Sequence, residues 1–148
     1  MFSIRWLDNP CAHSLTCRFP HAGRLCEESG YLYLKVSDLY IQTLFAKCNL
    51  SPPWHMPSSC VPGGIGAHIS VIYKEERRGC EMSLLQSEYG FDTMRIAEVS
   101  IVNKMYYVLW VRSEMLTMLR VAHGLSPQPC YKGYSIPFHI TFARRAAC

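Results

Sequence analysis

The sequence predicts a single α+β domain in which one order of elements, strand, helix, loop and strand, occurs twice. Two runs of strand-forming residues are each followed by a helix-capping pair and then by apolar residues at helical spacing. Each predicted helix ends at a Leu-Ser-Pro segment, and the loop after it leads into a short apolar run that contains a histidine. At 148 residues the chain is long enough for one domain with its own core.

The first unit is expected over residues 31–73. Residues 31–36 form a predicted strand, and Ser37 with Asp38 makes a pair that favours a helix N-cap. Apolar residues then recur on one helical face until residues 50–53, where two prolines end the helix. A loop bearing proline and glycine leads into the strand that contains His68.

The second unit is expected over residues 94–145 and repeats this order. After a strand at 94–102, residues 105–111 form a further strand, and Ser113 caps a helix that runs to about residue 122. A second Leu-Ser-Pro segment ends this helix, and the next loop leads into the strand that contains His139.

The remaining segments carry weaker patterns. The first thirty residues are broken by prolines and glycines, and we expect an irregular extension or a short edge strand there. Residues 80–90 are expected to contain a short helix between the two units.

Both closing strands carry a histidine, an apolar residue and a hydroxyl residue in succession: His68-Ile69-Ser70 and His139-Ile140-Thr141. Residues two apart on a strand point to the same face, so each strand presents an imidazole beside a hydroxyl. Such a short pattern arises easily by chance, and two half-buried structural histidines are the alternative interpretation. The equivalent places of the two patterns in the two units favour a paired active site.

The two motifs resemble those of the 2H phosphoesterase superfamily, also called the LigT or 2′-5′ RNA ligase-like group. Residues 66–71 are similar to its first H-x-[ST] motif, with Ser70 where threonine is frequent, and residues 137–144 are similar to its second. The resemblance covers residues 31–144. It implies a bilobal α+β fold with two pseudo-symmetric lobes, antiparallel sheets lining a central cleft and helices outside. It also implies metal-independent cleavage of phosphodiester bonds in RNA ends or small nucleotides.

The side chains of the two motifs suit that chemistry. His68 and His139 are the expected catalytic residues, because an imidazole reaches both protonation states near neutral pH and a pair can serve as acid and base. Which histidine is the base stays open. Ser70 and Thr141 are expected to donate hydrogen bonds to the phosphate and to orient it. This scheme needs no cofactor and no metal.

Further substrate contacts are expected from residues near the second motif. Trp110, Tyr107, Tyr131 and Tyr134 can stack on nucleobases, although packing in the core is the more frequent use of strand residues such as Trp110 and Tyr107. Lys132 and Tyr134 lie in the loop just before the second motif, from which a cationic or phenolic donor can reach phosphate.

The expected function is therefore a phosphodiesterase acting on a nucleotide or a short RNA. Its substrate stays open between a 2′-5′-linked oligoadenylate, a cyclic nucleotide messenger and an RNA terminus. The superfamily includes viral enzymes that destroy such messengers to blunt host immunity, and the compact length fits that role. The alternative is a non-catalytic RNA- or nucleotide-binding module that keeps the fold, and the presence of both histidines and both hydroxyls argues against it.

Charge and hydropathy restrict the partners. The formal net charge of +4 suits an anionic ligand without requiring a nucleic acid. Nowhere do about 18 apolar residues run together, so we expect a soluble, cytoplasmic protein without a membrane partner, and a monomer.

Eight cysteines are present, but no CxxC motif accompanies them. Free thiols are therefore favoured over a disulfide scaffold. Zinc is the less favoured use of an irregularly spaced N-terminal cluster, which consists of Cys11, His13, Cys17, His21 and Cys26.

Overall fold

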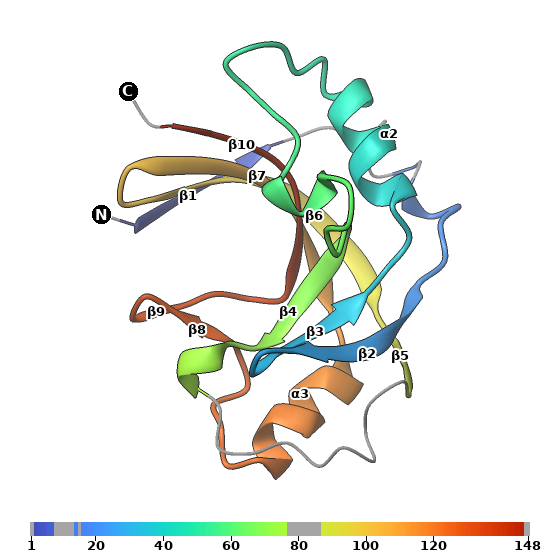
Figure 1. Ribbon diagram of the computed structural model, residues 1–148, viewed down its shortest axis with the longest axis vertical. Coiled ribbons are helices and arrows are strands. Elements are labelled where there is room, and N and C mark those ends of the chain that lie inside the picture. Colours follow the sequence, from blue (N-terminus) through green and yellow to red (C-terminus); the bar gives the residue numbers. More distant parts are fainter. Residues whose placement is uncertain (1, 8–13, 15, 77–86, 147–148) are drawn as a thin grey trace.

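One antiparallel sheet of eight strands forms the centre of the fold (Figure 1). The computed structural model describes residues 2–7, 14, 16–76 and 87–146. Its strands are β1 (Phe2–Leu7), β2 (Ala22–Glu28), β3 (Tyr31–Lys35), β4 (His68–Ile72), β5 (Glu88–Gly90), β6 (Asp92–Ile101), β7 (Lys104–Arg112), β8 (Cys130–Tyr131), β9 (Tyr134–Ser135) and β10 (His139–Ala146). The helices are α2 (Leu39–Lys47) and α3 (Glu114–Ala122), with short 3-10 turns η1 (Ser58–Cys60) and η2 (Lys74–Glu76).

The strand order of the large sheet is β1-β6-β7-β10-β4-β3-β2-β5, and β8 pairs with β9 in a separate hairpin. The sheet therefore joins its two halves at the pair β10 and β4, where Ile140 lies opposite Ile69. On each side of this pair the chain supplies a hairpin, a helix and a histidine-bearing strand in the same order. The α+β class is as predicted. The strands of both halves form one continuous sheet, so the division into two symmetric lobes stays a prediction.

The alternation of side chains along the strands gives the sheet two different faces. On one face, the larger core cluster contains fully buried residues of β3, β4 and β10, among them Leu34, Ile69 and Phe142, and it includes buried residues of both helices. On the other face lies a smaller cluster built mainly from β6 and β7, with Val99 and Val108 buried in it. The helices and the β8–β9 hairpin lie on different sides of the sheet (Figure 1). The histidines belong to the face without helices, since their neighbours Ile69 and Ile140 point into the larger core.

The N-terminal thirty residues contribute more than the sequence indicated. β1 is an edge strand paired with β6, which agrees with the expected short edge strand. β2, however, pairs with β3 on one side and β5 on the other, and its Leu25 is fully buried. The expectation of an irregular extension is therefore wrong for Ala22–Glu28. The prolines and glycines that punctuate this region obscured the strand, and pairing with β5, a non-local interaction, stabilises it together with the β2–β3 hairpin.

Two further expectations concern short segments. A short helix was expected within 80–90; residues 80–86 lie outside the described part of the chain, and Glu88–Gly90 forms strand β5 instead. Among the described residues, no helix has the length and the apolar composition needed to cross a membrane.

Candidate active site

The two histidine motifs lie side by side at the centre of the sheet. Because Ile140 is opposite Ile69 in an antiparallel pair, the register puts His139 level with Ser70 and Thr141 level with His68. All four side chains belong to the same face, since each is one residue away from an isoleucine that points into the core. The sheet thus brings together two imidazoles and two hydroxyls from positions about seventy residues apart in sequence.

Both imidazoles are held in the same way by the chain that precedes them. His68 Nδ1 lies 2.7 Å from the carbonyl oxygen of Gly66, and His139 Nδ1 lies 2.9 Å from that of Pro137. A carbonyl only accepts hydrogen bonds, so Nδ1 carries the proton in each ring. Nε2 is then the nitrogen of each histidine that can gain or lose a proton during a reaction.

The backbone around each histidine is anchored to the neighbouring hairpin strand. The amide of Val36 donates to the carbonyl of Ala67, and the amide of Val111 donates to the carbonyl of Phe138. These carbonyls belong to the residues directly before His68 and His139. Each imidazole is therefore tethered to a segment that is itself fixed by a backbone hydrogen bond.

The turn before His68 has an additional clamp. Asp38 accepts hydrogen bonds from the Lys35 ammonium at 2.7 Å and from the Ala67 amide at 2.9 Å. Gly66 has a φ of +70°, and a Cβ there would lie 2.3 Å from an Asp38 carboxylate oxygen. Only glycine fits this close approach, so the Gly66 carbonyl that holds His68 depends on the absence of a side chain.

The pKa values of both histidines are lowered from the ordinary value, mainly by burial. For His68 the carbonyl of Gly66 opposes this effect, and the positive charge of Lys35 adds to it. For His139 the carbonyl of Pro137 opposes it, and a charge on His68 lowers the pKa further. The neutral imidazole is therefore favoured at both positions, and protonation of His68 disfavours protonation of His139. An anion bound between them would act in the opposite direction and favour one imidazolium.

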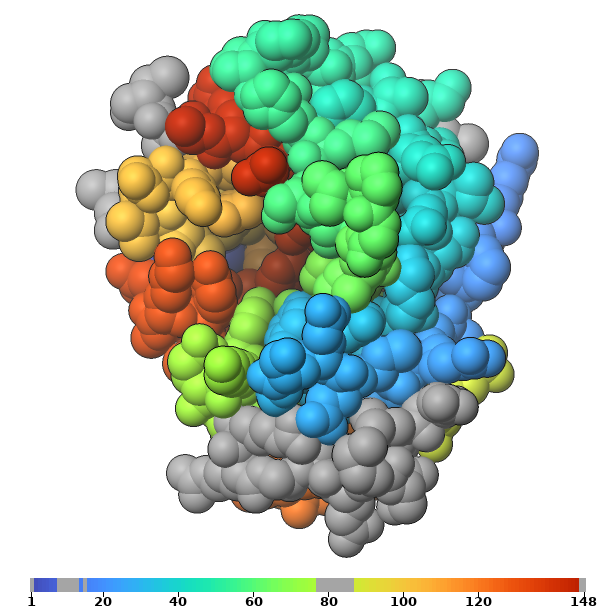
Figure 2. All heavy atoms as spheres, viewed as in Figure 1, coloured from blue at the N-terminus to red at the C-terminus, as the bar shows by residue number. Residues whose placement is uncertain are grey.

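A cavity of about 190 Å³ opens beside these side chains. Its polar wall contains Ser70, Thr141 and His139. The rest of its lining consists of apolar side chains and phenols from β6, β7, the β8–β9 region and the residue after β4: Val99, Ile101, Val108, Ile136, Tyr106, Tyr131 and Tyr73. Figure 2 shows a hollow on this face between the green segment near residues 55–72 and the yellow and orange segments, with β10 in dark red at its base.

None of the described side chains that line this cavity is a lysine, an arginine or a carboxylate. His68 is not one of the lining residues. Its ring packs edge-on against Tyr31 and Tyr33, with centroid distances of 6.1 and 5.7 Å. The cavity therefore adjoins the His139 side of the histidine pair more closely than the His68 side.

The predicted stacking residue Trp110 lies behind His139. It is opposite His139 in the β7–β10 pair, its ring meets the imidazole edge-on at 5.5 Å, and it is only 3% exposed. It does not line the cavity beside Ser70 and Thr141. Trp110 packs against His139, and its burial agrees with the packing in the core that the sequence favoured for it.

Tyr107 and Tyr131, which the sequence offered together with Trp110, separate to opposite faces. Tyr107 points toward the core side, where its ring lies 4.2 Å from that of Trp54. Tyr131 lines the cavity and lies 5.0 Å from the ring of Tyr73. Of the two, Tyr131 is placed to contact a bound ligand.

Lys132 and Tyr134 lie in the β8–β9 hairpin but outside the cavity lining. Lys132 occupies the turn with a φ of +50°, is exposed, and places its ammonium 5.3 Å from the ring centre of Tyr131. Tyr134 stacks on Phe2 at 4.9 Å. A direct role of either residue in substrate binding stays a prediction.

Several residues of the site were missed by sequence reasoning. Tyr31 and Tyr73 lie near Ser70, and the phenol of Tyr31 forms a short hydrogen bond with the Ser70 hydroxyl. Tyr106 lines the cavity from β7. The alternation of Tyr31, Tyr33 and Lys35 along one strand was a signal for a shared face, but only the register identifies that face as the one that carries the histidines.

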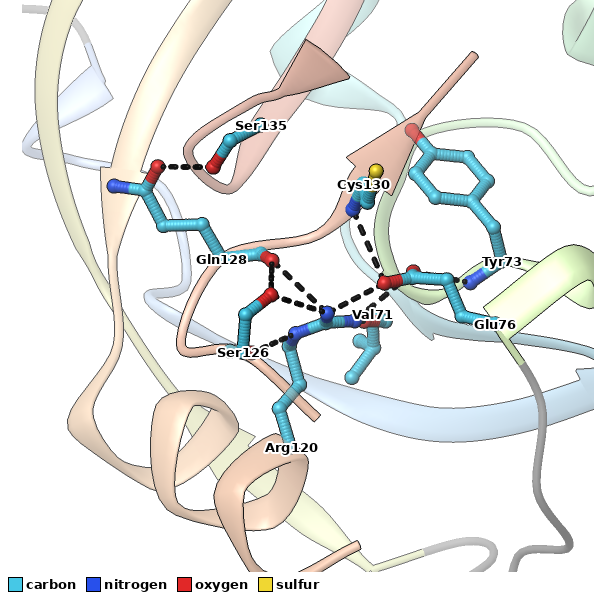
Figure 3. A network of polar contacts seen from close by, with 8 residues as sticks. All are labelled: Val71, Tyr73, Glu76, Arg120, Ser126, Gln128, Cys130 and Ser135. Atoms are coloured by element: carbon cyan, nitrogen blue, oxygen red, sulfur yellow. Dashed lines mark hydrogen bonds and ion pairs between the residues drawn. The ribbon is translucent and has the colours of Figure 1, made fainter. Parts of the chain in front are cut away.

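A buried ion pair holds together the segments that carry Tyr73 and the β8–β9 hairpin beside the cavity. The Arg120 guanidinium bonds both carboxylate oxygens of Glu76, at 3.1 and 2.6 Å, and it also bonds the carbonyls of Val71 and Gln128 (Figure 3). Glu76 in turn accepts from the backbone amides of Tyr73 and Cys130. The pair therefore ties α3 to the end of β4, to the segment of Tyr73 and to the start of the β8–β9 hairpin.

Zinc binding by the N-terminal cluster, the use that the sequence favoured less, receives no support from the described residues. Within residues 2–7, 14, 16–76 and 87–146, no three or more His, Cys, Asp or Glu side chains gather at a spacing suited to a metal ion. Cys11 and His13 lie outside this part of the chain, and His21 Nε2 contacts the carbonyl of Thr16 at 2.9 Å. Cys26, Cys60 and Cys130 are free thiols, as the sequence favoured.

A comparison with known protein families agrees with the fold. Residues 32–147 match the family model described as the Swiss Army Knife 2H phosphoesterase domain. No curated protein and no solved structure matches the chain. The matched segment contains both histidine-bearing strands and most of the eight-stranded sheet. Since the match covers well over half of the sequence, the chain belongs to the 2H phosphoesterase family and is a hydrolase of the phosphoesterase type.

Proposed function

We propose that this protein is a phosphodiesterase that cleaves nucleotides or short oligonucleotides by metal-independent acid-base catalysis with His68 and His139. One observation carries the proposal. His68, Ser70, His139 and Thr141 share one face of the β4–β10 pair, and each imidazole donates its Nδ1 proton to a backbone carbonyl. Both Nε2 atoms are thereby left for proton transfer at one phosphate.

The reaction follows from these side chains. The neutral histidine accepts a proton from a water molecule at Nε2 while the water oxygen attacks phosphorus. The bond between phosphorus and the leaving oxygen breaks, and the second histidine, as an imidazolium, gives its Nε2 proton to that oxygen. Ser70 and Thr141 donate hydrogen bonds to the non-bridging oxygens and hold the phosphate for in-line attack. One imidazole gains a proton and the other loses one, so a later exchange with water restores the pair.

The cavity supports a nucleotide as the substrate class. It adjoins the motif hydroxyls, and its apolar residues and three tyrosines offer an uncharged aromatic environment. Nucleobases stack on such rings with about 1–3 kcal/mol each. A 2′-5′-linked oligoadenylate, a cyclic nucleotide messenger and an RNA terminus all present a base next to a phosphodiester, and the degradation of an immune messenger is one role within this class.

The test is turnover in EDTA of a panel of diesters with different linkages. The panel contains a 2′,3′-cyclic nucleotide, a 3′,5′-cyclic nucleotide, a 2′-5′-linked diadenylate and a cyclic dinucleotide. We expect at least one to be hydrolysed, and His68→Ala and His139→Ala each to lower kcat by at least about 100-fold, since general acid-base catalysis contributes 10²–10⁴-fold.

His123→Ala is the matched control. His123 also bonds a backbone carbonyl through Nδ1, that of Leu119, but it lies at the end of α3 away from the motifs. Turnover that survives either motif substitution contradicts the two-histidine mechanism. Nucleotide binding without turnover of any diester would favour the non-catalytic binding module instead.

A further inference from the structure

The two motif hydroxyls have different surroundings, although they occupy corresponding places in the two motifs. Ser70 Oγ forms a short hydrogen bond with the phenol of Tyr31, and the ring of Tyr73 stacks on that of Tyr31 at 5.9 Å. Thr141 instead lies opposite Val108 on β7. The first motif therefore has a phenolic partner that the β7 position opposite the second motif does not provide.

The phenols remain protonated across the working pH range. Burial raises the pKa of Tyr31, and it raises the pKa of Tyr73 to about 12. Each phenol then keeps an O–H that it can donate. A serine hydroxyl has one donor and two acceptor lone pairs. When the Tyr31 phenol donates to Ser70, the Ser70 proton is not used in this bond and can be donated elsewhere.

The phenols are also held in fixed positions. The Tyr31 ring stacks between Tyr33 at 5.4 Å and Tyr73 at 5.9 Å. The same Tyr31 ring meets the imidazole of His68 edge-on. The backbone amide of Tyr73 donates to Glu76, whose carboxylate is bound by the buried Arg120 (Figure 3). Little reorganisation is therefore needed when an anion enters beside Ser70.

We propose that Tyr31 is a positioning residue of the active site, which donates a hydrogen bond to Ser70 Oγ and so directs the Ser70 O–H toward a phosphate oxygen of the substrate. This inference rests on the proposed phosphodiesterase function, and it assigns a residue that neither motif contains. It gives the first motif, where serine replaces the frequent threonine, a donor whose direction is set by its neighbours. Tyr31 does not line the cavity, so it acts on the substrate through Ser70, which does.

The test is a double-mutant cycle measured with the fastest substrate of the diester panel. Ser70→Ala is expected to lower kcat/KM by about 100-fold, in the range for loss of one donor to a developing charge. Tyr31→Phe keeps the stacked ring and is expected to lower kcat/KM by about tenfold. In the Ser70→Ala background, Tyr31→Phe should change kcat/KM by less than about twofold, because the group on which the phenol acts is already gone.

Tyr40→Phe is the structural control. Tyr40 is fully buried, and its phenol donates to the Pro20 carbonyl at 2.8 Å on the core side of the sheet. This variant removes a buried phenol without touching the site, so it should lower the melting temperature and leave kcat/KM unchanged. Equal losses of kcat/KM from Tyr31→Phe with and without Ser70→Ala would overturn the inference, because they would show a role in folding alone.

A second readout separates this inference from the proposed function. If no diester of the panel is hydrolysed, the proposed function fails, and the same cycle is measured with the affinity for adenosine 3′-monophosphate by calorimetry. The inference then predicts that Tyr31→Phe weakens binding only when Ser70 is present. Weakening that is the same in both backgrounds, or no weakening in either, contradicts it.

Discussion

At the scale of single residues, the hydrogen bond at Nδ1 of each imidazole determines which ring nitrogen can take part in proton transfer. The Nδ1 proton of His68 goes to Gly66 and that of His139 goes to Pro137, so both rings present the basic Nε2 atom away from the backbone. Glycine allows the close turn at the first position, and proline restricts the backbone at the second. Two different local solutions thus produce the same tautomer.

The lowered pKa values of the two histidines predict that the stability of the protein depends on pH. Unfolded histidine titrates near 6.5, and burial puts the folded values of His68 and His139 below this. As the pH falls through 6.5, the unfolded chain binds more protons than the folded one, so the free energy of unfolding decreases. It should decrease until the pH falls below the folded values.

Thermal unfolding between pH 8 and pH 5 measures this dependence. The double variant His68→Gln with His139→Gln should lose less stability over this interval than the wild-type protein, and each single variant should lie between them. Equal slopes for all four proteins would show that the histidines are not the source. The substitutions keep polar side chains of similar size, which limits other effects of the change.

At the scale of elements, a few buried polar contacts connect segments that the sheet alone does not join. The Ser113 hydroxyl accepts from the Leu116 amide at the start of α3 and donates to the carbonyl of Gly90 in β5. One turn from the end of the same helix, Arg120 reaches Glu76 and β4. Helix α3 is therefore fixed to the sheet at both ends. The contact of Arg120 with Glu76 also supports the cavity segments that carry Tyr73 and Tyr131.

We predict that breaking the pair of Arg120 and Glu76 strongly destabilises the fold. The side chain of Arg120 is 0% exposed and that of Glu76 is 10% exposed. Arg120→Met leaves the carboxylate buried without its partner, for which about 3–5 kcal/mol of unfolding free energy is typical. Urea denaturation measures this loss.

Two further variants test whether burial of the ion pair causes this loss. Adding Glu76→Leu to Arg120→Met should cost less than the sum of the two single substitutions, because no buried charge is then left unpaired. Arg5→Met removes the ion pair of Arg5 with Glu98, whose arginine side chain is 65% exposed, and should change stability little. Similar losses for Arg5→Met and Arg120→Met would contradict the importance assigned to burial.

At the scale of the whole molecule, the central pair of β4 and β10 joins the active site and the fold. Ile69 and Ile140 are both fully buried in the larger core. In sequence, each lies between the histidine and the hydroxyl residue of its motif, whose side chains point to the other face of the sheet. The larger core contains residues from both halves of the sheet, including Leu34 from β3 and Leu109 from β7. Neither half can lose its packing without exposing apolar surface of the other.

The continuous sheet predicts one cooperative unfolding transition. Tryptophan fluorescence reports on Trp6, Trp54 and Trp110, of which Trp6 and Trp110 belong to the β1 side of the sheet, while far-ultraviolet circular dichroism reports on all strands. The two signals should give coincident urea midpoints. Ile140→Ala should shift both midpoints together, with a cost of about 2–5 kcal/mol for removing a fully buried side chain. Separate midpoints for the two signals would instead indicate lobes that unfold independently.

The repeat of strand, helix and histidine strand was predictable from sequence because its signals are local. Capping by Ser113, the prolines after residue 50 and the alternation in residues 31–36 act within a few residues of the chain. The two H-x-hydroxyl motifs were found for the same reason, since two residues on one strand share a face whatever the rest of the fold does. Cytoplasmic location and the monomeric state stay predictions.

Strand order and register were decided only by the tertiary structure. β2 gains its place by pairing with β3 and β5, and nothing in its own residues indicates an inner strand. The register of Ile69 with Ile140 puts each histidine beside the hydroxyl of the other motif, and the folded chain brings Tyr31 to Ser70. Apart from the β2–β3 hairpin, these contacts join residues that are distant in sequence, and their energies arise from packing and hydrogen bonding that exist only once the sheet has formed. The sequence alone determined the two motifs to which we assign the chemistry, and the fold decided which of their residues meet.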